Sequence, residues 1–224
     1  LDDSNIDSNY TCTYYPWVKT FDNDNNQYIY LPPTKDVVKN FAYTVNTAYP
    51  WFAAAGWNRG QISGVNPKKV LKLSEQDELY GGRINFINKF ASEGMRIWGD
   101  KNLQVAESQM NRISKRRLLV RIRKLLSIAC IGLIFDPNDN TTVKSFKSAV
   151  EPILDDIRNK RGLTDYRIEV DDSQEARDRL ELPAKIYLKL QPNLEYIDIS
   201  CVITPSGAKF DDVYFISGIL IKER

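Results

Sequence analysis

One stretch of the sequence stands apart from the rest, Tyr49-Pro50-Trp51-Phe52-Ala53-Ala54-Ala55-Gly56-Trp57-Asn58-Arg59-Gly60. It places two tryptophans, a phenylalanine and three alanines between a proline and a closing glycine. Such a run is too apolar for a solvated loop, and it contains too many turn residues for a regular helix or strand. Glycine permits close approach of the backbone, and large aromatic rings anchor a segment to a core. We therefore predict a buried, irregular connection here.

Composition limits the possible classes of function. With 224 residues, 42% of them apolar, the chain can bury a core in one domain or in two small ones. A net charge of +2 gives no argument for a nucleic-acid or membrane partner. The absence of histidine removes the commonest general base and the commonest transition-metal ligand. The three cysteines are far apart and form no CxxC pair, which indicates buried thiols in a reducing compartment.

The ends of the chain and its apolar runs carry further expectations. The longest apolar run, Ile128 to Phe135, is too short to cross a bilayer, and the N-terminus lacks a signal-peptide pattern. The sequence begins with Leu1-Asp2-Asp3, so we expect it to be a piece of a longer protein.

The first half of the chain alternates between strand and helix patterns. Tyr10 to Val18 and Gln27 to Leu31 are typical of two strands joined by a polar turn. A helix is predicted from Thr34, as cap, to about Thr47, with Val37, Val38, Phe41 and Val45 on its apolar side. The shorter segments that follow are a helical stretch from Ser74 to Leu79, an amphipathic piece at Ile84–Phe90 and a strand at Met95–Trp98.

The second half contains the clearest helices. Leucines and isoleucines at helical spacing predict a long helix from about Ser108 to Leu133. A second helix is predicted from Thr142, capped by Asn140 or Thr141, to Gly162. Its predicted apolar stripe consists of Val143, Phe146, Val150, Ile153, Leu154 and Ile157. Strand patterns follow at 166–170, 184–190 and 194–203, and a last apolar stretch at 213–221. The predicted fold is α/β or α+β: a mixed β-sheet packed with several helices in a core of residues 1–208, with an extended C-terminal strand arm at 209–224.

Seven basic residues and no acidic one lie on the first of these helices. They are Arg112, Lys115, Arg116, Arg117, Arg121, Arg123 and Lys124. Most are expected to project away from the leucines as a basic stripe. Such a stripe suits phosphates, an acidic protein surface or neighbouring carboxylates, and a solvated face with local salt bridges explains it equally well. No aromatic residues alternate with the basic ones, which disfavours nucleic-acid binding but leaves it as the alternative function.

Catalytic and metal-binding patterns are weak. Asp155-Asp156 and Asp171-Asp172 are adjacent pairs whose side chains point in different directions, so they do not form an acid/base pair. Gly81-Gly82 lacks the spacing of a phosphate-binding loop. The stretch 136–140 lacks the glycine and the closing glutamate of a calcium loop, which favours a turn leading into a capped helix. We expect neither an enzyme nor a cofactor or metal.

Short motifs rich in aromatic residues and proline follow one another between about Tyr14 and Thr204. The series comprises Tyr14-Tyr15-Pro16-Trp17-Val18, Leu31-Pro32-Pro33, the 51–60 stretch, Leu79-Tyr80, Ile84-Asn85, Ile97-Trp98-Gly99-Asp100-Lys101, Arg116-Arg117-Leu118, Phe135-Asp136-Pro137-Asn138, and Pro192 with Glu195 and Ile197. In this order the motifs resemble the conserved C-terminal region of contractile tail sheath proteins, from myovirus-type phages and related injection machines. The chain departs from the family pattern at Ala54, Asn102 and Ser114-Lys115, where proline, threonine and Asn-Val are usual. The resemblance implies that six residues form the signature of the sheath core: Trp51, Ala55, Gly56, Gly60, Trp98 and Gly99.

The resemblance implies a mechanical role in a virion tail, with assembly in the host cytoplasm. Sheath subunits of this family polymerise as stacked six-membered rings around an inner tube and contract to drive the tube through a cell envelope. The implied partners are other copies of the chain, the inner tail tube protein, and baseplate and tail terminator proteins, without a membrane. Family members also carry a further N-terminal region, which is not seen here.

Two kinds of contact are expected in such a sheath. From its charge, and not from the resemblance, we hypothesise that the basic helix faces the tube or acidic patches on an adjacent subunit. Neighbouring subunits are expected to exchange terminal strands, a form of β-augmentation. The residues expected to take part in the exchange are Tyr196, Ile197, Ile199, Cys201, Ile203, Val213, Phe215, Ile216, Ile219 and Ile221.

Overall fold

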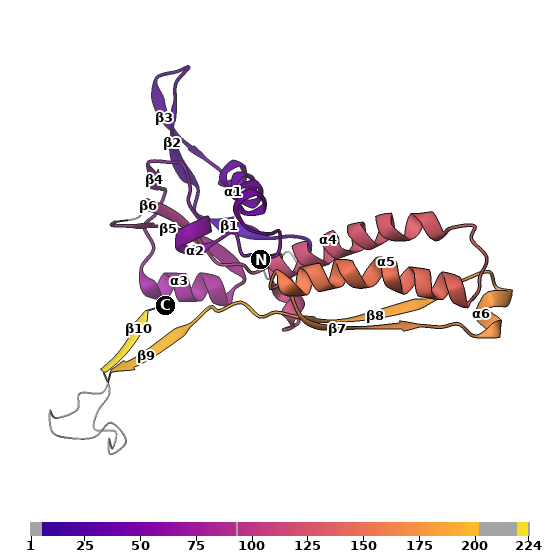
Figure 1. Ribbon diagram of the computed structural model, residues 1–224. Helices are drawn as coiled ribbons and strands as arrows, with labels where there is room; N and C mark the ends of the chain where they lie inside the picture. The colour runs from indigo at the N-terminus through magenta and orange to yellow at the C-terminus, as the bar shows by residue number, and fades with distance from the viewer. Residues whose placement is uncertain (1–5, 93, 202–218, 224) are drawn as a thin grey trace, which may run out of the picture. The chain divides into compact units, whose positions relative to one another are not determined.

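The computed structural model describes residues 6–92, 94–201 and 219–223. The chain divides into two compact units, residues 1–191 and residues 192–224. The first unit contains all of the helices described, together with strands β1 to β8 (Figure 1). The predicted mixed α/β class is confirmed. The boundary expected between residues 208 and 209 lies outside the described residues.

Two small sheets form the N-terminal part of the first unit. The first sheet has the order β1-β5-β6, with β1 parallel to β5 and β5 antiparallel to β6; its strands are β1 Thr13–Tyr15, β5 Ile84–Phe90 and β6 Gly94–Trp98. The second has the order β3-β2-β4; its strands are β2 Val18–Asp22, β3 Gln27–Leu31 and β4 Asn66–Pro67. The single strand predicted for 10–18 is therefore wrong. Pro16, which has no N–H to donate to a ladder, separates β1 in one sheet from β2 in the other.

Helix α1 spans Thr34–Thr47, the bounds that the sequence predicts. Its cap and its buried face differ from the prediction. Pro33 occupies the cap position, and the buried side chains are Val37, Asn40 and Thr44, while Val38 and Val45 are exposed. The Thr44 hydroxyl donates to the Asn40 carbonyl at 2.7 Å, so the buried hydroxyl is satisfied within the helix. The buried Asn40 Nδ2 has no hydrogen-bond partner among the described residues. Helix α3, Leu73–Gly81, begins with Glu75 accepting from the Lys72 backbone N–H at 2.9 Å.

Two long helices and a β-ribbon form the rest of the first unit. Helix α4, Ile113–Cys130, and helix α5, Asn140–Asn159, pack together, and the ribbon of β7 Leu163–Val170 and β8 Ala184–Leu190 lies along α5 (Figure 1). The short helix α6, Gln174–Asp178, connects the two strands. Asp139 caps α5 by accepting from the Thr141 and Thr142 backbone N–H groups, both at 2.9 Å. The caps predicted at Asn140 or Thr141 are thus one or two residues late.

The buried side chains of the first unit form two clusters. The cluster that we call the helical core contains Trp51, Leu118, Ile122, Phe146, Val150, Leu154, Ile157, Leu163 and Leu190. The cluster that we call the sheet core contains Val18, Val37, Ile62, Ile87, Met95 and Ile97. The apolar stripe predicted for α5 supplies four members of the helical core, because residues three and four apart share one side of a helix.

The second unit contains a hairpin of β9 Ile197–Cys201 and β10 Ile219–Glu223. The two strands are antiparallel, with Ile221 opposite Ile199 and Ile219 opposite Cys201. This ladder uses one edge of each strand, so the described backbone has pairing capacity left on the other edges.

Candidate functional site

The first residues of the 49–60 stretch pack against the helical core. The Trp51 indole is buried, and its Nε1 donates to the Lys160 carbonyl at the end of α5 at 3.0 Å. Its ring stacks on Tyr49 with centroids 5.0 Å apart. Gly162 packs against the same ring, since a Cβ there would lie 3.2 Å from Trp51 Cε2. The positive φ that ends α5 belongs to Arg161 rather than to the predicted Gly162.

The same stretch then reaches the sheet core. Ala54 is buried and Ala55 packs against the sheet core. Gly56 adopts a φ of 79° at the start of the one-turn helix α2, Gly56–Arg59. A Cβ on Gly60 would lie 2.6 Å from the Ile97 carbonyl oxygen of β6, closer than side chains are found to pack, so glycine is required there.

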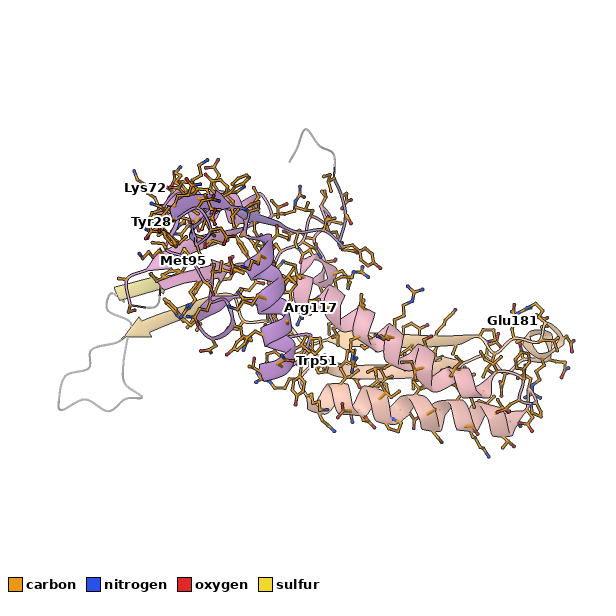
Figure 2. The ribbon with its side chains drawn as sticks, turned by 90° about the horizontal axis from the view of Figure 1, so that it is seen from above. Tyr28, Trp51, Lys72, Met95, Arg117 and Glu181 are labelled. Atoms are coloured by element: carbon orange, nitrogen blue, oxygen red, sulfur yellow. The ribbon has the colours of Figure 1, made fainter. Side chains whose placement is uncertain are left out.

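An aromatic cluster completes this contact. Trp57 of α2 meets Phe90 of β5 and Trp98 of β6 edge to face, with ring centroids 4.7 and 5.6 Å apart. The predicted irregular connection is confirmed, with α2 as its one regular turn, but its burial is partial: Trp51, Ala54 and Gly60 are buried, whereas Trp57 and Asn58 are exposed. Residues 49–60 thus join the helical core to the sheet core, as Figure 2 shows at Trp51, where the stretch meets the helix pair.

A second junction lies where β6 gives way to α4. The buried Asp100 side chain accepts from the Ser114 hydroxyl at 2.5 Å and from the Ser114 backbone N–H, and its own carbonyl accepts from Ile113 N–H at 2.8 Å. A carboxylate at the start of α4 also complements the helix dipole. Burial raises the pKa of Asp100 to about 6, although the Ser114 hydrogen bonds and the charges of Lys115 and Arg112 oppose the shift.

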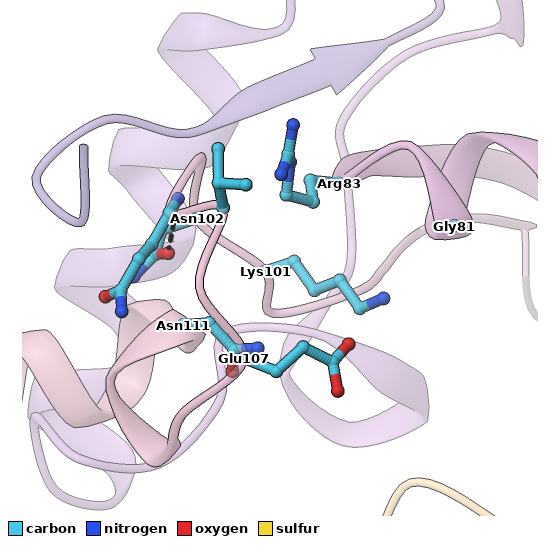
Figure 3. A pocket seen from close by; sticks show the side chains of 8 residues that line it. Gly81, Arg83, Lys101, Asn102, Glu107 and Asn111 are labelled. Carbon is cyan, nitrogen blue, oxygen red and sulfur yellow. Dashed lines mark hydrogen bonds between the residues drawn. The ribbon is translucent and has the colours of Figure 1, made fainter. Parts of the chain in front are cut away.

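Two buried asparagines hold the chain around Asp100. Asn85 of β5 donates to the carbonyls of Thr13 and Lys101 at 3.2 and 2.7 Å, and accepts from Lys101 N–H at 2.8 Å. Gly99 has a φ of 131°, and a Cβ there would meet Asn85 Oδ1 at 2.7 Å. Asn102, labelled in Figure 3, donates to the Met110 carbonyl at 2.7 Å.

Figure 3 shows Lys101 and Asn102 among the side chains that line a small depression of about 80 Å³, together with Arg83 and Glu107. The role of Asp100 and Ser114 was not predicted from the sequence, in which this region supplies only motif landmarks. The sequence does contain a signal for this role, because the polar residues Asp100, Lys101 and Asn102 directly follow the apolar end of β6. Polar groups that are buried need hydrogen-bond partners, so a polar network could have been predicted there.

The predicted basic stripe is divided by the structure. Lys115 is buried, so its predicted place in an exposed stripe is wrong. Arg112 donates to Asn111 Oδ1 at 2.6 Å. The Arg116 guanidinium lies over the Tyr10 ring at 4.3 Å. The Arg117 guanidinium lies over Phe41 of α1 at 4.6 Å and donates to its carbonyl at 3.1 Å, which places Arg117 beside α1 in Figure 2.

The exposed part of the stripe lies further along α4. Arg121, Arg123 and Lys124 are exposed and stand next to the buried Ile122 on one turn of the helix. The four residues at the start of α4 therefore make contacts within the chain, whereas the three that follow present their charge on its surface.

The predicted strand-exchange residues lie in the second unit. Tyr196 and Ile197 are exposed. Ile199 and Cys201 of β9 pair with Ile221 and Ile219 of β10 within the chain. Ile203, Val213, Phe215 and Ile216 lie outside the described residues.

Searches of the described residues for other kinds of site give two findings. In that part of the chain, no group of three or more cysteine or carboxylate side chains is placed to hold a metal ion. Among the helices described, none combines the length and the apolar character needed to cross a membrane.

Comparison with curated proteins finds relatives along almost the whole chain. It is 34% identical over 212 residues to the tail sheath protein of Vibrio phage KVP40, an alignment covering 93% of this chain and 31% of that protein. It is 27% identical over 218 residues to the tail sheath protein of Enterobacteria phage T4, covering 96% of this chain and 33% of the relative. The chain thus spans about a third of the length of these relatives. No protein-family model matches it.

Solved structures share the fold. The sheath complex of an extracellular contractile injection system, in its contracted state, superposes with a TM-score of 0.78 at 22% identity, over 92% of this chain and 58% of that one. The helical sheath of the anti-feeding prophage, also contracted, gives a TM-score of 0.76 at 20% identity, over 90% of this chain and 57% of that one. Sequence and fold agree with the order of motifs noted above. The chain belongs to the tail sheath protein family.

Proposed function

We propose that the chain is part of a sheath subunit that polymerises as a helical array around an inner tube and contracts to drive the tube through a cell envelope. The observation that carries this proposal is the likeness to tail sheath proteins of phages along more than nine-tenths of the chain. The role is structural rather than enzymatic. Its site of action is the virion tail, after assembly in the host cytoplasm.

The construction of the first unit suits a part that moves without deforming. The helical core and the sheet core are joined by residues 49–60 and again by the contact of Asp100 with Ser114. Contraction of a sheath requires subunits to pass between two packings, the second lower in free energy than the first. A subunit whose cores are coupled transmits such a motion as a rigid body, because packed interiors resist continuous deformation.

The hairpin of the second unit supports exchange of strands between neighbouring subunits. Each of its strands has one edge left for further pairing. The β7–β8 ribbon is also two-stranded among the described residues, so it offers edges on which a partner strand can add. An exposed strand of this kind favours aggregation in a monomer and suits a protein with a waiting partner sheet.

Removal of the last strand tests the exchange. A full-length subunit truncated before Val213 is expected to lose the ability to form sheath-like polymers while remaining soluble. Truncated subunits that still form intact tubes would contradict the exchange without contradicting polymerisation itself.

The exposed basic residues of α4 are proposed to face the inner tube or an acidic patch on an adjacent subunit. Arg121 and Arg123 are the residues to test, because Arg116 and Arg117 are engaged with aromatic rings of their own chain. The variant Arg121→Glu/Arg123→Glu is expected to weaken assembly around the tube at low salt, and the difference from wild type should shrink as salt rises. Lys144→Glu, at an exposed position of α5, serves as the control. Equal assembly of all three proteins would mean that α4 is merely solvated.

No observation in the structure favours the nucleic-acid alternative. Three exposed basic residues without neighbouring aromatic side chains make a small electrostatic site. A gel shift with duplex and single-stranded DNA at low salt should show no specific complex.

Electron microscopy of the purified full-length subunit tests the proposed function. Tubes with a helical surface lattice are expected, and addition of the inner tube protein should set their bore. The proposed contacts with baseplate and tail terminator proteins would be seen at the two ends of such tubes. A preparation that stays monomeric under all assembly conditions would contradict the proposal.

A further inference from the structure

Four large apolar side chains are exposed where α4, α5 and α6 come together. Ile131 and Ile134 follow α4, with 68% and 59% of their surface exposed, and Phe135 next to them is fully exposed. Leu180, after α6, is 89% exposed. Two hydrogen bonds bring the segments together: Asn138 donates to the Glu181 carbonyl at 2.9 Å, and Arg177 donates to Asn140 Oδ1 at 2.8 Å. We call Ile131, Ile134, Phe135 and Leu180 the apolar tip.

The backbone supports the exposed position of the two most prominent of these residues. Phe135 has a φ of 78° and Leu180 a φ of 57°, in the left-handed region that bulky residues seldom occupy. Each is stabilised by its turn: Asp136 N–H donates to the Leu133 carbonyl at 3.3 Å, and Glu181 N–H donates to the Ala176 carbonyl at 3.0 Å. Residues in such conformations concentrate at functional sites, because a cost of this kind persists where the surroundings fix it. An exposed apolar cluster is in turn typical of a binding surface.

The tip carries negative charge around its apolar centre. Residues 131–140 and 171–181 contain seven acidic side chains and two basic ones. Asp136 is exposed beside Phe135, and Glu181 is exposed beside Leu180. A partner therefore needs an apolar or aromatic recess bordered by positive charge.

The chain itself has such a surface on the β3-β2-β4 sheet. Tyr15, Trp17, Lys68 and Lys69 line an open depression of about 510 Å³. Trp17 is 49% exposed, and Lys68 Nζ lies 6.0 Å from the centre of its ring and 5.8 Å from that of Tyr30. Lys69 Nζ is bound to Glu75 at 2.6 Å, which leaves Lys68 as the central cation. We call Tyr15, Trp17, Tyr30 and Lys68 the lysine–aromatic face.

We propose that the apolar tip of one copy binds the lysine–aromatic face of a second copy, an inference that rests on the proposed function as a sheath. Phe135 would enter the aromatic recess, where ring contacts add to the burial of apolar area. Asp136 would approach Lys68. The tip and the sheet that carries the face lie at opposite ends of the first unit, as the labels Glu181 and Tyr28 show in Figure 2. Two different patches that bind each other form a heterologous contact, which generates an open array.

A charge exchange in the full-length subunit tests the contact. Asp136→Lys and Lys68→Glu should each raise the protein concentration needed for polymer formation about threefold or more, because each replaces an attraction by a repulsion. The two substitutions together in one chain should restore it to within about twofold of wild type. Glu151→Lys and Lys144→Glu, at exposed positions of α5, are the matched single controls. When a control substitution is combined with Asp136→Lys or with Lys68→Glu, the concentration needed for polymer formation should stay as high as in the single variant.

Two further variants and a cross-link locate the contact. The double variant Phe135→Ser/Leu180→Ser should raise the protein concentration needed for polymer formation about tenfold, since it removes the apolar anchor. A photoreactive benzoylphenylalanine in place of Phe135 should form cross-links to peptides containing Trp17 or Lys68 of another copy, as read by mass spectrometry.

The outcomes separate this contact from the proposed function. Tubes that form normally with every variant, or cross-links that map elsewhere, would overturn the contact and leave the sheath role intact. Failure of the wild-type subunit to polymerise would overturn the sheath role. Cross-linking of the unpolymerised protein would then test the contact by itself. Copies that bind through the apolar tip would still give cross-links to the predicted peptides, and the absence of such cross-links would overturn the contact.

Discussion

The helical core and the sheet core differ in the chemistry that surrounds them. Of the residues that the structure describes, all nine buried polar side chains lie between positions 40 and 115, in or beside the sheet core. None of the nine belongs to α5, β7 or β8, where the buried side chains are apolar. Apolar packing depends on volume and shape, whereas a buried polar group needs each of its partners in place. The helical core should therefore tolerate apolar replacements that conserve volume more readily than the network around Asp100 and Asn85 tolerates loss of a hydrogen-bonding group.

The junction at residues 49–60 should produce the largest effect, because it belongs to both cores. Trp51→Ala is expected to lower the free energy of unfolding by about 3–5 kcal/mol, since it opens a cavity and leaves the Lys160 carbonyl without its donor. Trp17→Ala is the matched control, because Trp17 lies outside residues 49–60 and its side chain is 49% exposed. Urea unfolding of both variants provides the measurement. Equal losses would show that residues 49–60 are not a junction.

The close approach of the junction to β6 gives the next effect. Gly60→Ala places a methyl group 2.6 Å from the Ile97 carbonyl oxygen, and neither backbone can move freely. The expected loss in the free energy of unfolding is about 3 kcal/mol. Gly81→Ala at the end of α3 meets no atom within 4 Å and should be neutral or gain up to about 1 kcal/mol. The same urea titration distinguishes the pair, and a neutral Gly60→Ala would contradict the geometry.

The polar network offers a smaller and more specific test. Ser114→Ala removes the hydroxyl that donates to Asp100 and should cost about 1–3 kcal/mol, because a buried carboxylate loses a partner. Ser145→Ala, at an exposed position of α5, should change the free energy of unfolding by less than about 0.5 kcal/mol. If thermal unfolding shows the two variants to be alike, the Ser114 hydroxyl adds nothing to the stability of the polar network around Asp100.

The pH dependence of stability is the finest of these effects. Burial raises the pKa of Asp100 from its usual value of 3.8 to about 6 in the folded chain. Between these values the folded state binds more protons than the unfolded state, so the contribution of Asp100 to stability falls as pH rises from about 4 to 6. One proton gives a slope of at most about 1.4 kcal/mol per pH unit. Asp100→Asn removes this contribution, so the free energy of unfolding of the variant should rise relative to that of wild type as pH goes from about 4 to 6. A difference between the two proteins that does not change with pH would contradict the shift.

The same difference between the cores explains what the sequence predicts. The bounds of α1 and β3 and the apolar stripe of α5 follow from the sequence, because a period of 3.6 and Pro-Pro stops are local signals. Strand β5 gives no alternation, since four consecutive residues, Asn85 to Asn88, are buried. The burial of Lys115 has no local signal, because the carboxyl group whose charge it faces, Asp100, comes from the loop before α4.

The proposed mechanical role requires the helical core and the sheet core to move as one body. Native-state hydrogen exchange measures this directly, since it reports the free energy at which each segment opens. The Ile97 N–H in β6 donates to the Gly60 carbonyl at 2.7 Å. We expect the backbone amides of Ile97 and of Leu154 in α5 to exchange through openings of equal free energy and equal dependence on denaturant. Opening of α5 at a clearly lower free energy, with β6 still protected, would show two bodies rather than one and would contradict the rigid subunit.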